Sequence, residues 1–117
     1  MSITIGKIKT QQKNLRGWLV GQFMTGEFHD DNVEIFCKEF LPGDTSDKLH
    51  YHPIGTEYLF VIKGKIRFKV GNEILSLKSG DYLKISNQTR DQLLEVLTKT
   101  TIFGIRYPSV PNNKVFV

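Results

Sequence analysis

Strict alternation of apolar and charged residues is the feature that most restricts how this chain can fold. In residues 65–70, Ile66, Phe68 and Val70 alternate with three basic residues. Successive side chains of an extended chain point to opposite faces, so the apolar set can face a core while the basic set faces water. The pattern predicts a half-buried strand. No stretch of ten or more residues shows the apolar spacing of an amphipathic helix.

Short segments rich in β-branched and aromatic residues recur along the rest of the chain, separated by turns rich in Gly, Pro, Asn and Asp. About eight short strands without a long helix predict an all-β sandwich or barrel. Besides residues 65–70, the expected strands are residues 18–24, 33–40, 57–62, 74–77, 82–85, 92–97 and 101–106.

The length of 117 residues fits one ordinary domain, and no repeat, linker or low-complexity tract divides it. We expect a core barrel over about residues 18–106, with terminal extensions at 1–17 and 107–117. Two prolines prevent the second extension from being a central strand, but its apolar end at residues 115–117 can pack on the barrel or add an edge strand.

Composition restricts the cellular compartment and the classes of binding partner that we expect. A single cysteine, Cys37, excludes an intramolecular disulfide and fits a reducing compartment, where we expect it to pack in the core. No long apolar run or export signal is present, so we expect a cytoplasmic protein without a membrane partner. The net charge of +4 is too small to argue for nucleic acid, and no exposed aromatic series accompanies the basic residues to stack bases.

Two histidines and a glutamate form the clearest chemical motif. His50 and His52 stand two residues apart, so on an extended strand both imidazoles point to the same side. A short bend over residues 53–56 lets the next strand bring Glu57 alongside them. Two imidazoles and a carboxylate that converge in this way can hold a first-row divalent metal and leave coordination positions open for water or substrate. Without a metal, these residues would be a polar cluster at a barrel mouth.

The motif resembles the first conserved motif of the cupins, in which a glycine precedes His-x-His, a glutamate and a second glycine. Gly43, His50, His52, Glu57 and Gly64 match it, except that six residues rather than five separate Gly43 from His50. The resemblance spans roughly residues 33–106. It implies a jelly-roll β-barrel with a divalent metal, such as Fe, Mn, Zn or Ni, held by His50, His52 and Glu57.

The second cupin motif is weaker in this sequence. Counted from Gly80, the positions of its proline and glycine hold Ser86 and Gln88, and the position of its metal-binding histidine holds Asp91. The position of its asparagine holds Glu95. The resemblance therefore implies that Asp91 is the fourth ligand. Two carboxylates with two imidazoles favour Mn(II), Fe(II) or Zn(II) over copper.

The register of the strand that follows residue 90 leaves alternatives open. A slip of one residue would exchange Asp91 for Gln92 or Arg90 at the pocket. Gln92 would be a neutral oxygen ligand, and Arg90 would indicate an anionic substrate. Asp91 could equally be a solvated turn residue paired with Arg90, and Glu95 an outward surface residue.

Two functional hypotheses follow. The first is a metal-binding cupin that holds a small polar molecule in its barrel and acts on it, for example as an oxygenase or isomerase. Tyr51, Tyr82 and Glu95 are then candidate acid, base or substrate contacts. The second is a non-catalytic module that binds a carbohydrate or an anionic metabolite, with a degenerate metal site or none; the weak second motif favours it. The fold cannot select a reaction.

The strand at residues 57–62 also predicts a partner. Its inward set begins at Glu57, and its opposite face carries Tyr58, Phe60 and Ile62. A sheet face this apolar is rarely left in water, so we expect a homodimer in which two copies cover it.

Overall fold

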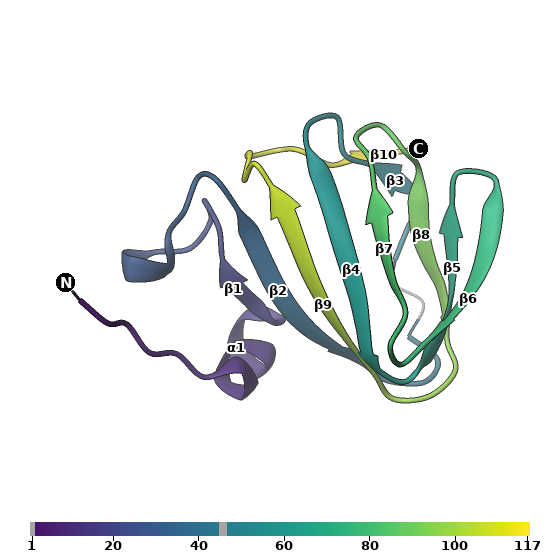
Figure 1. Cartoon of the computed structure of the whole chain (residues 1–117), viewed down its shortest axis with the longest axis horizontal. Coiled ribbons are helices and arrows are strands. Elements are labelled where there is room, and N and C mark those ends of the chain that lie inside the picture. The colour runs from purple at the N-terminus through teal and green to yellow at the C-terminus, as the bar shows by residue number, and fades with distance from the viewer. Residues whose placement is uncertain (1, 45–46) are drawn as a thin grey trace.

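The computed structural model describes residues 2–44 and 47–117. Within these ranges the chain forms two five-stranded antiparallel sheets that face each other (Figure 1). The strands of the first sheet, in spatial order, are β1 (Trp18–Val20), β2 (Glu34–Phe40), β9 (Thr100–Tyr107), β4 (Thr56–Lys63) and β7 (Tyr82–Ile85). Those of the second are β10 (Val115–Phe116), β3 (His50–Tyr51), β8 (Asp91–Val96), β5 (Lys65–Val70) and β6 (Glu73–Lys78). The expectation of an all-β jelly-roll fold is confirmed.

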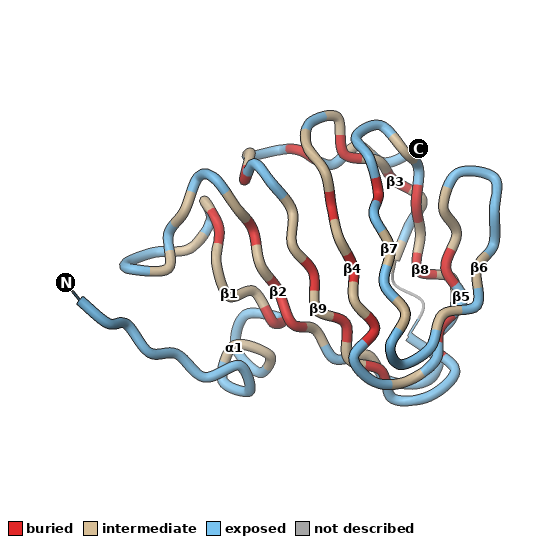
Figure 2. Tube along the Cα trace, viewed as in Figure 1, coloured by how far each residue is buried: buried red, intermediate tan, exposed pale blue. Residues whose placement is uncertain are grey.

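The chain passes repeatedly between the sheets, so residues that are distant in sequence face one interior. Strand β4 lies in the first sheet, β5 and β6 in the second, β7 in the first, β8 in the second and β9 in the first. Each inward face is apolar, as the alternation predicts, and the buried residues follow the strands as a row of alternating segments in Figure 2. The core contains Phe36, Leu59, Val61, Ile66, Phe68, Ile85, Leu93, Val96 and Ile102.

Strand β4 has the two faces that its sequence predicts. Glu57, Leu59 and Val61 are buried, while the residues between them are half-buried or exposed. The outer face of this sheet is aromatic: Phe60 stacks on Tyr82 with ring centroids 5.6 Å apart and lies 6.1 Å from Phe103. We call Tyr58, Phe60, Tyr82 and Phe103 the aromatic face.

Several boundaries differ from the expected ones. The strand expected at residues 18–24 ends at Val20, and the described residues form ten strands because two short ones, β3 and β10, add to the expected eight. Strand β10 pairs with β3, so the C-terminal extension adds an edge strand. A short 3-10 helix, η1 (Gly26–Phe28), follows β1.

The helix α1 (Ile8–Leu15) has no counterpart in the sequence analysis. It buries none of its residues, so no apolar stripe marks it. Two side-chain amides hold it instead: Gln11 donates to the carbonyl of Trp18 and Gln12 to that of Cys37. No helix in the part of the chain that the structure describes has the length and apolar character needed to cross a membrane.

Gly64 occupies the turn between β4 and β5 with φ of +102°. A Cβ at this position would lie 2.2 Å from Thr100 Oγ1 and 2.6 Å from the carbonyl oxygen of Lys99. Both the backbone conformation and the close approach of β9 therefore require glycine here. Gly71 has φ of +59° but nothing within 4 Å of its would-be Cβ.

This contrast predicts different costs for two glycine substitutions. Gly71→Ala should lower the free energy of unfolding by about 1–2 kcal/mol, the cost of a left-handed backbone for an L-residue. Gly64→Ala should cost about 1–3 kcal/mol more because overpacking adds to the strain. Urea denaturation of both variants measures the difference. Equal losses would show that contact with β9 does not restrict Gly64.

Candidate metal centre

The two histidines lie together at one end of the barrel interior. His50 is the first residue of β3 and His52 follows that strand directly. Both are buried, and their ring centroids are 5.2 Å apart. The spacing of two residues along an extended segment therefore turns both imidazoles inward, as the sequence predicts.

A backbone hydrogen bond fixes the protonation pattern of His50. Its Nδ1 lies 2.6 Å from the carbonyl oxygen of Lys48. A carbonyl oxygen only accepts, so Nδ1 carries the proton and Nε2 presents its lone pair to the interior. Metal-binding histidines are commonly oriented in this way by a partner of the second ring nitrogen.

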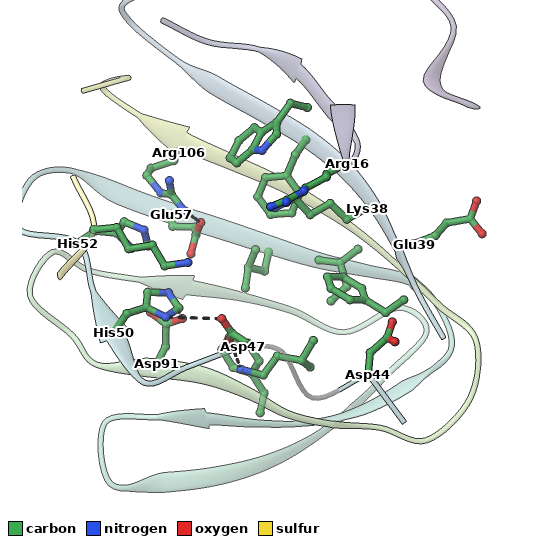
Figure 3. A pocket seen from close by; sticks show the side chains of 18 of the residues that line it. Arg16, Lys38, Glu39, Asp44, Asp47, His50, His52, Glu57, Asp91 and Arg106 are labelled. Atoms are coloured by element: carbon green, nitrogen blue, oxygen red, sulfur yellow. Dashed lines mark hydrogen bonds and ion pairs between the residues drawn. The ribbon is translucent and has the colours of Figure 1, made fainter. Parts of the chain in front are cut away.

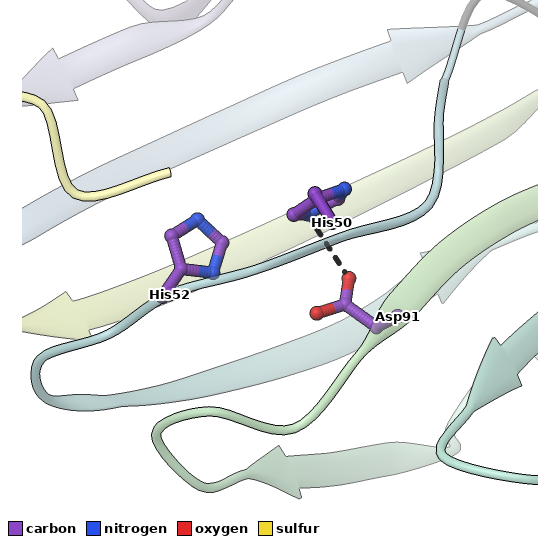
Figure 4. Close-up of side chains that lie close together, drawn as sticks. All are labelled: His50, His52 and Asp91. Carbon is purple, nitrogen blue, oxygen red and sulfur yellow. Dashed lines mark ion pairs between the residues drawn. The ribbon is translucent and has the colours of Figure 1, made fainter. Parts of the chain in front are cut away.

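Asp91 faces the histidines from the neighbouring strand. It pairs directly with His50 in the antiparallel ladder of β3 and β8, and only 2% of its surface is exposed. Asp91 Oδ1 lies 3.3 Å from His50 Nε2 (Figure 4). Among the described residues, Oδ2 has no hydrogen-bond partner although it is buried. A buried carboxylate oxygen without a partner is costly, and a cation would satisfy it.

Burial shapes the ionisation of all three groups. Desolvation, followed by the negative charges of Glu57 and Asp47, raises the pKa of Asp91 to about 8. Desolvation and the positive charge of Arg106 lower the pKa of His52 to about 3, and desolvation also lowers the pKa of His50. Both imidazoles are thus neutral at physiological pH, the form that binds a metal.

His50, His52 and Asp91 together form a set that fits a metal ion, and we call it the metal cluster. Each offers a ligand atom within 4.8 Å of the others. Two imidazoles and one carboxylate suit first-row divalent ions such as Fe, Mn, Zn or Ni. The unpartnered Asp91 Oδ2 is the structural observation that supports this fit.

Glu57 lines the same cavity but is engaged elsewhere. Arg106 Nη2 donates to its Oε2, and Arg106 Nη1 donates to Glu34 Oε1 at 2.6 Å. The hydroxyl of Ser109 donates to the second oxygen of Glu34 at 3.1 Å. One guanidinium thus pairs with two buried carboxylates and offsets one of their two negative charges. The structure therefore brings Glu57 close to the metal cluster without including it, and its assignment as a ligand stays a prediction.

The metal cluster opens into a cavity of about 700 Å³ between the two sheets (Figure 3). Core residues such as Leu59, Phe68 and Leu93 line its apolar part. In Figure 3, Lys38 and Arg16 reach in from the side away from His50 and Asp91. The cavity thus combines an apolar surface with a few polar groups, as in small-molecule sites.

The register of β8 settles which side chain faces this cavity. Asp91 is inward, Gln92 is half-buried and donates to the carbonyl of Asp47, and Arg90 is exposed. Glu95 is exposed and pairs with Arg67 at 3.6 Å. The slipped registers are therefore not adopted.

The other candidate contacts lie apart from the cavity. Tyr51 and Tyr82 are not among the residues that line it, and Tyr82 is 71% exposed on the outer sheet face. The third histidine, His29, is exposed and pairs with Asp31 at 3.3 Å.

Sequence reasoning missed the cations that line the cavity, among them Lys38 and Arg106. Both follow the inward alternation of their strands, Lys38 between Phe36 and Phe40 and Arg106 two positions beyond Gly104. A charged residue on the otherwise apolar face of a strand was the available signal.

The ionisation of Asp91 predicts how the metal-free protein responds to pH. The folded state keeps the Asp91 proton up to a pKa of about 8, while the unfolded state loses it near its ordinary value of about 4. Raising the pH therefore lowers the free energy of unfolding, by up to about 1.4 kcal/mol per unit. The histidines act in the opposite direction, because their folded pKa values are lowered, but that gain is complete above their unfolded pKa of about 6.5.

We therefore expect a fall in stability between about pH 6.5 and about pH 8 in the presence of chelator. Asp91→Asn should remove the fall. Urea denaturation across this range measures it, and a slope that persists unchanged in the variant would contradict the shifted pKa.

Comparison with known proteins agrees with this architecture. The sequence matches the cupin domain family over residues 37–90. A comparison with curated protein sequences finds no match. A Klebsiella pneumoniae protein with a double-stranded β-helix domain superimposes with a TM-score of 0.72 at 16% identity, over 99% of this chain and 98% of that one.

Two enzymes share the fold at similarly low identity. The DMSP lyase DddQ of Ruegeria pomeroyi gives a TM-score of 0.69 at 17% identity, over 86% of this chain and 49% of the lyase. The salicylate 1,2-dioxygenase of Pseudaminobacter salicylatoxidans gives 0.60 at 14% identity, over 69% of this chain and 23% of the dioxygenase. These likenesses show the fold, and the match to the cupin domain family over residues 37–90 supports membership of the cupin superfamily.

Proposed function

We propose that the protein binds a divalent transition metal through the metal cluster and holds a small polar molecule beside it in the cavity. The observation that carries the proposal is the buried Asp91, whose Oδ2 has no partner among the described residues and which faces two neutral imidazoles. A cation there would compensate the carboxylate and occupy the lone pairs that His50 and His52 present.

The remaining polar residues would position the bound molecule. Arg106 holds the Glu57 carboxylate, whose second oxygen has no hydrogen-bond partner among the described residues and could accept one from the bound molecule or join the ligand set. The apolar part of the cavity excludes water from one side of the site. When bound, the metal would act as a Lewis acid toward a coordinated oxygen of the substrate.

This arrangement suits an oxygenase or an isomerase that acts on a small polar substrate. A lyase and a dioxygenase occur on the same fold, so the fold does not choose the reaction. The alternative is a binding module without catalysis, which the carboxylate in place of a third histidine favours. Recovery of the untagged protein without metal and with a tightly bound organic molecule would support that alternative.

Metal analysis tests the proposed centre. The untagged protein should contain about one Fe, Mn, Zn or Ni per chain by mass spectrometry of the elements. His52→Ala and Asp91→Asn should each weaken binding about 100-fold or more, because a ligand contributes at least as much as the residues that orient it. Glu57→Gln should weaken it only about tenfold, since Arg106 already compensates that carboxylate.

His29→Ala is the matched control, because His29 is exposed and lies outside the metal cluster. This variant should bind metal as the wild type does. Equal metal content in His29→Ala, His52→Ala and Asp91→Asn would overturn the proposed centre.

We also propose that the aromatic face mediates a homodimer. Cross-strand pairing places Phe103, Phe60 and Tyr82 in one row across β9, β4 and β7. Tyr82 is 71% exposed although it stacks on Phe60. A continuous apolar row on a sheet is a surface that a second copy can cover by symmetry.

Sedimentation at tens of micromolar should therefore show a dimer. Tyr82→Glu should convert it to a monomer, because the charge would be buried without a partner. Ile74→Glu, at a 55% exposed position of β6 in the other sheet, should leave the dimer intact. A monomeric wild type, or a dimer that persists in Tyr82→Glu, would remove the proposal.

A further inference from the structure

Lys38 is a cation inside the barrel that the metal centre does not use. It lies on β2 between Phe36 and Phe40, and all three side chains line the cavity. Lys38 is half-buried, and an ammonium group withdrawn from water normally has a carboxylate partner. Lys38 takes part in no ion pair among the residues that the structure describes, although Glu39, its neighbour, pairs with Lys99 at 3.3 Å.

The surroundings of the Lys38 ammonium group are aromatic and positive. Its Nζ lies 4.5 Å from the ring centroid of Trp18 and 4.9 Å from that of Phe36, and we call these two rings the aromatic shelf. Burial, followed by the positive charges of Lys114 and Arg106, lowers the pKa of Lys38 to about 8. An anion placed here would relieve both the desolvation and the repulsion.

The acids of the cavity do not fill this role. Glu57 is held by Arg106, which also binds Glu34, and Asp91 belongs to the metal cluster. Asp47 accepts a hydrogen bond from the backbone of Leu93 at 2.7 Å. Each of these carboxylates already has a partner or a proposed cation, so the charge that completes the Lys38 environment would come from a ligand.

We propose that Lys38 forms an anion subsite in the cavity and binds the carboxylate of a small organic acid, whose apolar part packs on the aromatic shelf. Lys114 also lines the cavity and supplies a second positive charge nearby. This inference rests on the proposed function for the cavity as the substrate site, and it specifies the class of molecule bound there. A carboxylate suits the subsite better than a phosphate, since Lys38 is a point cation without the fork of an arginine, and a dianion is more costly to desolvate.

The intrinsic fluorescence of Trp18 can report the binding of a ligand at this subsite. Trp18 is the single tryptophan of the chain and lies against the Lys38 ammonium group. A ligand seated on the aromatic shelf should therefore change the intrinsic fluorescence of the protein. The signal does not require metal, so the subsite can be tested apart from the metal centre.

The test compares cyclohexanecarboxylate with its neutral analogue cyclohexanecarboxamide on metal-free protein. The acid should bind the wild type about tenfold more tightly than the amide, the usual contribution of a charge-assisted hydrogen bond. Lys38→Met should abolish this preference, and Lys38→Arg should retain most of it. Lys65→Met, which removes an exposed lysine of β5 outside the cavity, should bind as the wild type does.

Three results would overturn the subsite: no binding of either probe, equal binding of acid and amide by the wild type, or a preference that survives in Lys38→Met. Tighter binding of inorganic phosphate than of the carboxylate would overturn the assigned ligand class. Metal content measured on the same samples separates the two proposals. Metal binding without acid preference removes the subsite alone, and acid preference without metal binding removes the metal centre alone.

Discussion

Compensation of buried charge is the constraint on which the interior of this barrel depends. The inner faces of the two sheets supply an apolar core. The same interior contains two carboxylates that pair with Arg106, one carboxyl group beside His50, and an ammonium group that lies over two aromatic rings. Charges removed from water are tolerated only with a partner, a changed protonation state or a bound ion. How each group is compensated decides what the cavity can bind.

The buried acidic side chains are stabilised in two different ways. Glu34 and Glu57 share the single positive charge of Arg106, so each of these carboxylates has an ion-pair partner inside the protein. Asp91 lies beside neutral imidazoles, and its pKa rises because burial and the nearby carboxylates outweigh the positive charges of Arg106 and Lys114. The first arrangement gives each carboxylate a charged partner without a ligand, and the second would gain one with a cation. This difference separates a structural ion pair from a centre that can take a metal.

Much of the fold and part of the candidate site follow from local rules. Alternation fixed the inward face of β4, and the His50 and His52 pair turns inward because of its spacing on an extended segment. The position of Asp91 in the interior also agrees with motif spacing, although alternation alone allowed a slip of one residue. The helix α1 escaped prediction because hydrogen bonds from Gln11 and Gln12, rather than an apolar stripe, attach it to the sheet.

The sequence by itself determined the class of fold, the apolar faces of the strands and the two inward histidines, because these depend on the period of an extended chain and on neighbours within a few residues. Only the tertiary structure decided that Glu57 is held by Arg106, that Asp91 pairs with His50, and that Lys38 lies over Trp18. Those contacts join residues from strands that meet only when the two sheets close. Their partners are set by register and by packing across the barrel, which no local pattern encodes.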